Sequence, residues 1–187
     1  MKNVLVLTGA GQIGLAIVRS IGSGMKIVVS DKSAANAASA ALLLNNAGFD
    51  AVEHSCDISS KESVAELIKF SKELGPITAF VNAAGVSPSQ ASIETILKVD
   101  LYGTAMLIEE IGKVIEPNGV GVTISSQSGH RMPALGEEKD RRLATTPVEE
   151  LLSLDFLQPE NISNTLHAYQ LAKRCNVKRV MAEAVKW

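Results

Sequence analysis

Short runs of β-branched and other apolar residues alternate along the chain with longer segments whose apolar positions follow a helical spacing. Five runs predict strands: NVLVLT, KIVVS, DAVEHS, ITAFVN and VGVTIS, at residues 3–8, 26–30, 50–55, 77–82 and 120–125. Apart from DAVEHS, they are largely apolar on both faces, which is typical of buried parallel strands. DAVEHS mixes polar and apolar residues, and we therefore expect it at an edge of the sheet.

Four intervening segments have the composition and end signals of helices. We expect these helices at residues 12–22, 33–48, 59–75 and 92–115. In the third, Ser59 followed by Glu62 resembles a capping box, and Gly75-Pro76 supplies the stop. The regular alternation of strands and helices predicts βαβ units with right-handed crossovers. The expected fold is therefore α/β, with a doubly wound, Rossmann-like parallel sheet.

Residues 130–165 interrupt this alternation. The segment contains the charged cluster EEKDRR, prolines and the short amphipathic piece VEELLSL. A connection of this length inside a compact domain is usually functional or disordered. We interpret it as an insertion that serves as a lid or substrate loop.

Composition and charge place the chain among ordinary globular proteins. Its 187 residues are 46% hydrophobic and 20% charged, with a net charge of −2, and we expect one domain over residues 1–187. No basic patch favours nucleic acid, and no apolar run is long enough for a signal peptide or a membrane span. We therefore expect a cytoplasmic protein without a nucleic-acid or membrane partner. Cys56 and Cys175, like the three histidines, lack the spacing of metal ligands, so free thiols and no metal site are expected.

The stretch LTGAGQIG follows the first predicted strand and opens the first predicted helix. It places Gly9, Gly11 and Gly14 in the spacing GxGxxG. Such glycines allow a tight turn, and the first N–H groups of the helix, together with its dipole, favour a pyrophosphate. The predicted cofactor contacts include Gln12 and Ile13 between the last two glycines. A glycine turn without a ligand is the alternative when this motif is taken alone.

An acidic residue, Asp31, follows the second predicted strand. It stands at the distance from the glycines where a carboxylate can accept hydrogen bonds from an adenosine ribose. A carboxylate here would repel a 2′-phosphate, so we predict NAD(H) and regard NADP(H) as the less favoured cofactor. Lys32 beside it weakens that preference. The alternative role for Asp31 is a helix cap or a solvated side chain.

Two further motifs, CDIS and NAAG, follow the third and fourth predicted strands, and with them the chain resembles the short-chain dehydrogenase/reductase family. The resemblance implies that Asp57 contacts the adenine amino group and that Ile58 lies against the ring. It also implies that four residues at the end of the fourth strand stabilise the sheet and flank the cofactor: Asn82, Ala83, Ala84 and Gly85. A helix cap at Asp57 and a plain turn after the fourth strand are the alternatives.

The motifs ISSQSG and YQLAK resemble the catalytic serine and the YxxxK pair of the family. On a helix, residues four apart share a face, so Tyr169 and Lys173 can face the same cleft. The resemblance implies that Tyr169 exchanges a proton with the substrate oxygen, that Ser126 hydrogen-bonds this oxygen, and that Lys173 tunes Tyr169 and holds the nicotinamide ribose. A neighbouring ammonium favours phenolate, which brings a phenol closer to useful acid–base chemistry at neutral pH. A surface Tyr/Lys pair is the alternative.

The chain departs from the family pattern at two positions. Its glycine turn is one residue shorter than TGxxxGxG, so contacts in the first turn can differ. In KVDLYG, Asp100 stands where the family usually has an asparagine that helps to connect the lysine to water. An aspartate can also hold a water, but it adds negative charge beside Lys173. We include Asp100 among the catalytic candidates, with a surface helix aspartate as the alternative.

Ser126 and Tyr169 are 43 residues apart, whereas most relatives have a short connection here. The inserted segment resembles that of bacterial hydroxysteroid dehydrogenase/carbonyl reductase members, in which it lies near the substrate. The resemblance therefore implies an NAD-dependent oxidoreductase that interconverts a secondary alcohol and a ketone, with a bulky, for example steroid-like, substrate. A non-catalytic nucleotide-binding module and an epimerase-like relative remain alternatives.

The resemblance also carries expectations about the end of the chain and about assembly. Relatives continue beyond the YxxxK helix, so we expect five of the usual seven strands in a chain shortened at its C-terminus. The long fourth helix and the YxxxK helix commonly pair across subunits in this family. We therefore expect a homo-oligomer.

Overall fold

The computed structural model describes residues 1–187. The chain forms two compact units. Unit 1 consists of Met1–Ala84, Glu110–Ile124 and Trp187, and unit 2 of Gly85–Glu109 and Ser125–Lys186. No helix combines the length and the apolar character that crossing a membrane requires.

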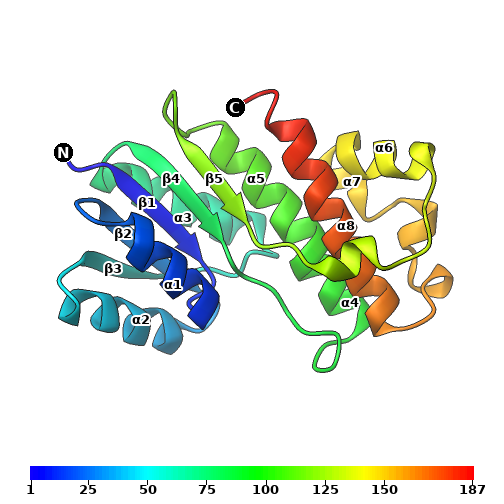
Figure 1. Cartoon of the computed structure of the whole chain (residues 1–187), viewed down its shortest axis with the longest axis horizontal. Helices are drawn as coiled ribbons and strands as arrows, with labels where there is room; N and C mark the ends of the chain where they lie inside the picture. Colours follow the sequence, from blue (N-terminus) through cyan, green and yellow to red (C-terminus); the bar gives the residue numbers. More distant parts are fainter. The chain divides into compact units, whose positions relative to one another are not determined.

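Unit 1 contains a five-stranded parallel sheet (Figure 1). Its strands are β1 (Val4–Thr8), β2 (Lys26–Asp31), β3 (Asp50–Ser55), β4 (Ile77–Asn82) and β5 (Val120–Thr123), in the order β3-β2-β1-β4-β5. Every pair of neighbouring strands is parallel. The predicted Rossmann-like α/β fold is confirmed, and β3 lies at an edge as its mixed composition indicated.

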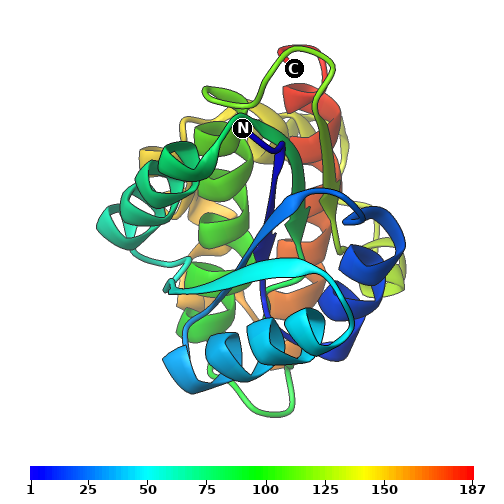
Figure 2. The same cartoon turned by 90° about the vertical axis from the view of Figure 1, so that its left-hand side faces the viewer.

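Helices cover the two faces of this sheet. In Figure 2 the blue helices α1 (Gln12–Ile21) and α2 (Ala34–Asn46) lie on one face and the blue-green helix α3 (Lys61–Leu74) on the other. Because side chains alternate along a strand, every second residue points towards α1 and α2. The resulting core cluster includes Leu5, Leu7, Val18, Ile27, Val29 and Leu44.

Two local expectations for unit 1 are wrong. Ser60, and not Ser59, caps α3, because the Ser60 hydroxyl accepts a hydrogen bond from the N–H of Ser63. β5 was expected to be buried on both faces, but Val120 and Val122 are 57% and 38% exposed. β5 is an edge strand, and no helix of unit 1 packs closely on the face to which Val120 and Val122 point, so the apolar character of its sequence does not lead to burial.

Unit 2 is helical. The helix expected at 92–115 is present as α4 (Ile93–Ile96), a π-helical stretch η1 (Leu97–Gly103) and α5, which runs from Thr104 to Gly112 and whose residues from Glu110 onwards belong to unit 1. The insertion folds into η2 (Gln127–His130), α6 (Glu137–Thr145), α7 (Val148–Leu151), η3 (Asp155–Leu157) and η4 (Pro159–Asn161). The YxxxK residues lie on α8 (Thr165–Glu183), as predicted.

Ion pairs and hydrogen bonds attach α6 of the insertion to α8. The guanidinium of Arg174 donates to both carboxylate oxygens of Asp140, and the Lys178 Nζ lies 3.3 Å from Asp140 Oδ2. The Nε of Arg179 donates to the backbone carbonyl of Leu143 at 2.8 Å. The insertion is therefore a folded, helical excursion that covers one side of α8.

The ion pair between α6 and α8 predicts a pH-dependent stability. The hydrogen bonds from Arg174, assisted by Lys178, hold the pKa of Asp140 below its ordinary value. Since the folded-state pKa is the lower one, the stabilisation is complete above the unfolded pKa of about 3.9 and is lost as the pH falls through the folded pKa. We expect Asp140→Asn to lower the free energy of unfolding by about 1 kcal/mol at pH 7, and the difference from the wild type to shrink in acid. Urea unfolding at several pH values measures it.

Glu138→Gln provides the matched control for this prediction. Glu138 is also on α6 and also pairs with an arginine, Arg141, but both side chains are well exposed, at 67% and 63%. We expect a change within about 0.5 kcal/mol at every pH, because exposed ion pairs contribute little. Equal losses for the two variants would show that the contact of Asp140 with α8 does not stabilise unit 2.

Candidate active site

In unit 1 the predicted cofactor-binding residues gather where the parallel strands end. Gly9 follows β1, Asp31 is the last residue of β2, and Asn82 is the last residue of β4. The carboxyl ends of parallel strands are where open α/β sheets bind ligands. The residues that the sequence predicted from separate motifs are therefore brought to one edge of the sheet.

The β1–α1 turn requires glycine at one position for two separate reasons. Gly9 has a φ of +88°, and a Cβ placed on it would lie 2.4 Å from the backbone nitrogen of Ala84. Gly11 differs, since a Cβ there would meet no heavy atom within 4 Å. Gly9 thus permits close packing of this turn on the turn after β4, while Gly11 leaves open space beside the start of α1.

The start of α1 fits a pyrophosphate. Gly11 is the N-cap, and no side chain caps the first N–H groups of the helix. Gln12 is exposed and Ile13 is 60% exposed, whereas Gly14 is buried, with no room for a Cβ beside the carbonyl oxygen of Gly9. Free N–H groups at an open helix start are suited to a phosphate.

The Asp31 carboxylate is held by backbone groups on both sides. One oxygen accepts from the N–H of Ala10 at 3.0 Å and the other from the N–H of Ser33 at 2.9 Å. Asp31 therefore orders the glycine turn and the residue that precedes α2. The N-cap of α2 is Ser33, so Asp31 is not the helix cap considered as its alternative. Each carboxylate oxygen keeps a lone pair that could accept a ribose hydroxyl.

Asp57 is engaged in a similar way. Its Oδ1 accepts from the N–H and the hydroxyl of Ser59, and its Oδ2 lies 2.8 Å from the Lys32 Nζ. Partial burial raises the pKa of Asp57, but the hydrogen bonds from Lys32 and Ser59 outweigh it and lower the pKa overall. Ile58 beside it is buried. Lys32, which follows Asp31 in the sequence, thus pairs with the second of the two carboxylates predicted to meet the adenosine.

The turn after β4 is tied to β1. The Asn82 Oδ1 accepts from the Thr8 hydroxyl at 2.8 Å and from the N–H of Ala84 at 3.2 Å. Ala83 packs closely on Gly14, since a Cβ added to Gly14 would lie 3.1 Å from the Cβ of Ala83. The amide of Asn82 therefore fixes both the strand end and the conformation of the turn that follows it.

Unit 2 brings three of the four predicted catalytic residues together. The Lys173 Nζ lies 3.6 Å from Asp100 Oδ2 and 5.3 Å from the centroid of the Tyr169 ring. Lys173 is 5% exposed and Asp100 is fully buried, so neither is the surface residue that the alternative interpretation required. A buried ammonium is stable only when an opposite charge or hydrogen bonds compensate it.

Asp100 has an unusual environment for a carboxylate. Its Oδ1 accepts from the N–H of Val86 at 2.8 Å, while Oδ2 has no hydrogen-bond partner and faces Lys173 across the ion pair. Burial raises the pKa of Asp100, and the charge of Lys173 and the N–H of Val86 oppose this rise. A Cβ on Gly85 would lie 3.1 Å from Asp100 Oδ1, so only a residue without a side chain fits easily beside the pair.

The predicted catalytic serine lies in a segment that packs on α8. The Ser126 hydroxyl accepts from the N–H of Ser128 at 3.1 Å and begins η2. A Cβ on Gly129 would lie 2.7 Å from the backbone nitrogen of Arg174, so η2 rests directly on α8. The Ser125 hydroxyl donates to the carbonyl of Lys173 at 2.9 Å. The serine segment is thus fastened to α8 at Lys173, four residues beyond Tyr169.

One residue of this site was missed by the sequence interpretation. The side-chain amide of Asn176 lies between the carbonyl oxygens of Asp100 and Ala172, at 2.8 and 3.0 Å. The available signal was its position three residues after Lys173, which places the two residues on the same face of a helix.

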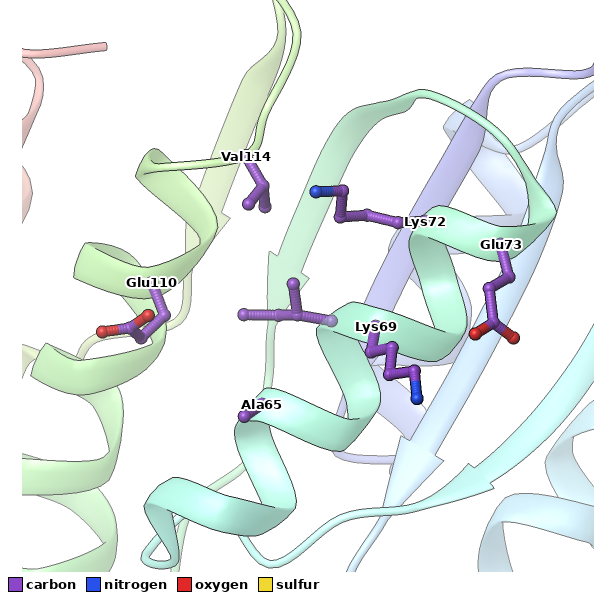
Figure 3. Close-up of a pocket in the computed structure, with 7 residues that line it drawn as sticks. Ala65, Lys69, Lys72, Glu73, Glu110 and Val114 are labelled. Atoms are coloured by element: carbon purple, nitrogen blue, oxygen red, sulfur yellow. The ribbon is translucent and has the colours of Figure 1, made fainter.

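One groove lies away from the predicted residues, and neither a metal cluster nor an exposed thiol adds to the site. A groove of about 410 Å³ between α3 and the C-terminal end of α5 contains none of the predicted residues (Figure 3). It is lined by Ala65, Ile68, Lys69, Lys72, Glu73, Glu110 and Val114. No three His, Cys, Asp or Glu side chains are grouped to hold a metal ion. Both cysteines are buried free thiols, and burial raises the pKa of Cys56 to about 11.

Comparisons with known proteins agree with this arrangement. A family model described as short chain dehydrogenase matches residues 2–137. The short-chain dehydrogenase/reductase bsc3 of Alternaria brassicicola is 34% identical over 187 residues, which are 100% of this chain and 68% of bsc3. Carbonyl reductase (NADPH) 1 of Bos taurus is 27% identical over 178 residues, with 88% of this chain and 64% of the reductase covered. The chain spans about two thirds of the length of these relatives.

Solved structures support the fold. The structure of an actinorhodin polyketide ketoreductase variant with NADPH superposes with a TM-score of 0.62 at 23% identity. The superposition covers 71% of this chain and 56% of the ketoreductase. The family model ends before α8, but the similarity to bsc3 extends through the YxxxK residues. The chain is therefore a member of the short-chain dehydrogenase/reductase family, whose members are oxidoreductases that bind a nicotinamide cofactor.

Proposed function

We propose that the chain provides the cofactor site and the acid–base residues of an NAD(H)-dependent oxidoreductase that interconverts a secondary alcohol and a ketone. The observation that carries this proposal is the buried ion pair of Lys173 and Asp100 beside the Tyr169 ring. Burying a charge costs desolvation free energy, so a buried ion pair needs a reason. Beside a phenol, in a family of oxidoreductases, the reason that fits best is acid–base chemistry. Both units, in this proposal, belong to one cofactor-binding domain.

Tyr169 would exchange a proton with the oxygen of the substrate. The Lys173 ammonium, 5.3 Å from the centre of its ring, stabilises negative charge that develops on the phenol oxygen. Ser126 would donate a hydrogen bond to the same substrate oxygen. A bound nicotinamide would supply or accept the hydride. Asp100 supplies the opposite charge that a buried ammonium requires, so we assign it a supporting role and not that of the proton donor.

The proposed preference for NAD(H) rests on Asp31. Its carboxylate is fixed at the end of β2 by two N–H groups, and a 2′-phosphate near it would be repelled. Lys32, the neighbouring cation, is already paired with Asp57. Binding of NADP(H), the cofactor named in the carbonyl reductases, would require Lys32 to leave Asp57 for the phosphate.

The insertion and the surface of α8 bear on substrate and assembly. We propose that the helices between residues 137 and 161 shape the site for a bulky, for example steroid-like, alcohol or ketone, as the carbonyl reductase resemblance suggests. The homo-oligomer stays a prediction. Since α6 covers one side of α8, pairing through this helix would use its exposed apolar residues, which are Leu166, Val180 and Met181.

Replacement of the phenol tests the proposed chemistry. We expect Tyr169→Phe to lower kcat/KM for a secondary alcohol at least about 100-fold, because general acid–base catalysis contributes this much, and to leave the Kd for NADH within about twofold. Tyr102→Phe is the matched control, since the chain has two tyrosines and this one lies in η1. NADH absorbance gives the rates and NADH fluorescence the affinity.

Each other outcome of this experiment points to a different function. Equal turnover by Tyr169→Phe and the wild type would remove Tyr169 from the mechanism. Tight NADH binding without turnover on a broad panel of alcohols and ketones would favour the non-catalytic module. Inversion of a carbinol centre without net formation of NADH would favour the epimerase-like alternative.

Cofactor preference is tested by removing one charge. We expect the wild type to bind NADH more tightly than NADPH. Asp31→Asn should lower the ratio of the Kd for NADPH to the Kd for NADH about tenfold, which corresponds to about 1.4 kcal/mol of binding free energy. The asparagine keeps an acceptor for one of the two N–H groups. Asp50→Asn, which removes a charge at the start of β3, should leave the ratio unchanged. Tighter binding of NADPH by the wild type would overturn the proposed preference.

A further inference from the structure

We infer that Asn176 is a positioning residue of the site: it holds the π-helical stretch η1 against α8 so that Asp100 faces Lys173. The inference rests on the proposed oxidoreductase function and adds a residue to it. Asn176 is 1% exposed, and burying its amide would cost free energy unless the amide were hydrogen-bonded.

The contacts of Asn176 determine the orientation of its amide. The backbone carbonyl oxygens of Asp100 and Ala172 lie 2.8 and 3.0 Å from one end of the amide group. Both are acceptors, so the amide nitrogen, with its two hydrogens, must face them. One side chain therefore satisfies a carbonyl of its own helix and a carbonyl of η1.

Asp100 is consequently fixed at both ends. Asn176 binds its backbone carbonyl, and the N–H of Val86 binds Oδ1 of its side chain. Oδ2 has no hydrogen-bond partner and lies 3.6 Å from the Lys173 Nζ. This oxygen is held near the ammonium by the geometry of η1 and by charge, because no hydrogen bond directs it.

The π-helical conformation makes this positioning necessary. A π-helix has i→i+5 hydrogen bonds, is rare, and is frequently found at functional sites. Asp100 lies in the middle of η1 (Leu97–Gly103), and η1 packs against α8. An extra donor on the Asp100 carbonyl stabilises the turn in the conformation that points its carboxylate at Lys173.

Neighbouring charges on the packed elements have other roles. Asp140 on α6 pairs with Arg174 and Lys178, and Glu94 in α4 and His130 in η2 are exposed. On α8 itself, Lys173 lies at ion-pair distance from Asp100. The pKa of Asp100 therefore depends on its burial, on the charge of Lys173 and on the N–H of Val86, and the Lys173→Met background isolates the part that comes from Lys173.

The test is a titration of Asp100 that does not need turnover. The ¹³C signal of its labelled carboxyl, assigned with Asp100→Asn, is followed against pH in the wild type, Lys173→Met, Asn176→Leu and the double variant. Loss of the cation in Lys173→Met should raise the pKa of Asp100 further. We expect Asn176→Leu to raise the pKa of Asp100 as well. In the Lys173→Met background the same substitution should raise this pKa less, because Asn176 acts through the interaction between Asp100 and Lys173.

Ser71→Ala is the control for general destabilisation. Ser71 is also fully buried, and its hydroxyl donates to the Leu67 carbonyl on α3 at 2.7 Å. We expect this variant to lower Tm without moving the Asp100 titration. A lower Tm for Asn176→Leu with an unchanged Asp100 titration would overturn the positioning role. If Asn176→Leu does not fold, Asn176→Gln, which keeps a donor, should preserve the wild-type titration, and a shifted titration there would overturn it equally.

Kinetics separate this inference from the proposed function. If both hold, Asn176→Leu should lower kcat about tenfold and change KM little, since small misplacements of catalytic groups reduce the rate of the chemical step. A shifted Asp100 titration in a chain that shows no redox activity would leave the positioning role intact and overturn the oxidoreductase. If Asn176→Leu lost activity while the Asp100 titration stayed unchanged, the positioning role would be overturned and the oxidoreductase function would stand.

Discussion

The burial of Lys173 next to Asp100 is the constraint on which the candidate site depends. Neither charge could remain in this environment alone, because desolvation of an isolated ion costs several kcal/mol. The surrounding structure is built to keep them together: η1 aims the carboxylate, the N–H of Val86 binds one of its oxygens, and Gly85 leaves room beside them. The Tyr169 ring then lies beside a positive charge that the fold holds in place.

A second set of residues depends on a simpler constraint. Parallel strands end at one edge, so Gly9, Asp31 and Asn82 meet there although they come from separate motifs. Their contacts are mutual: the aspartate binds the glycine turn, and the turn after β4 packs on Gly9. Residues predicted to touch a cofactor therefore also hold one another, and loss of one would disturb both binding and local structure.

Much of the fold could be predicted because its signals are local. Strand burial follows from continuous apolar runs, the edge position of β3 from its mixed residues, and the face shared by Tyr169 and Lys173 from helical spacing. Tertiary context decided what could not be predicted. VGVTIS has the sequence of a buried strand, yet Val120 is 57% exposed because no helix of unit 1 packs closely on β5. The π-helical turn at Asp100 and its contact with Asn176 join segments more than 70 residues apart, and no pattern within either segment indicates them.

A double-mutant cycle on Lys173 and Asp100 tests the central claim most directly. Urea unfolding gives the free energies of the wild type, Lys173→Met, Asp100→Leu and the double variant. If the two charges stabilise each other, each single variant should lose about 3 kcal/mol, because it leaves one buried charge unpaired, and the double variant should lose less than the sum of the two. Losses that add within about 0.5 kcal/mol would show that the two residues do not interact, and would contradict the account.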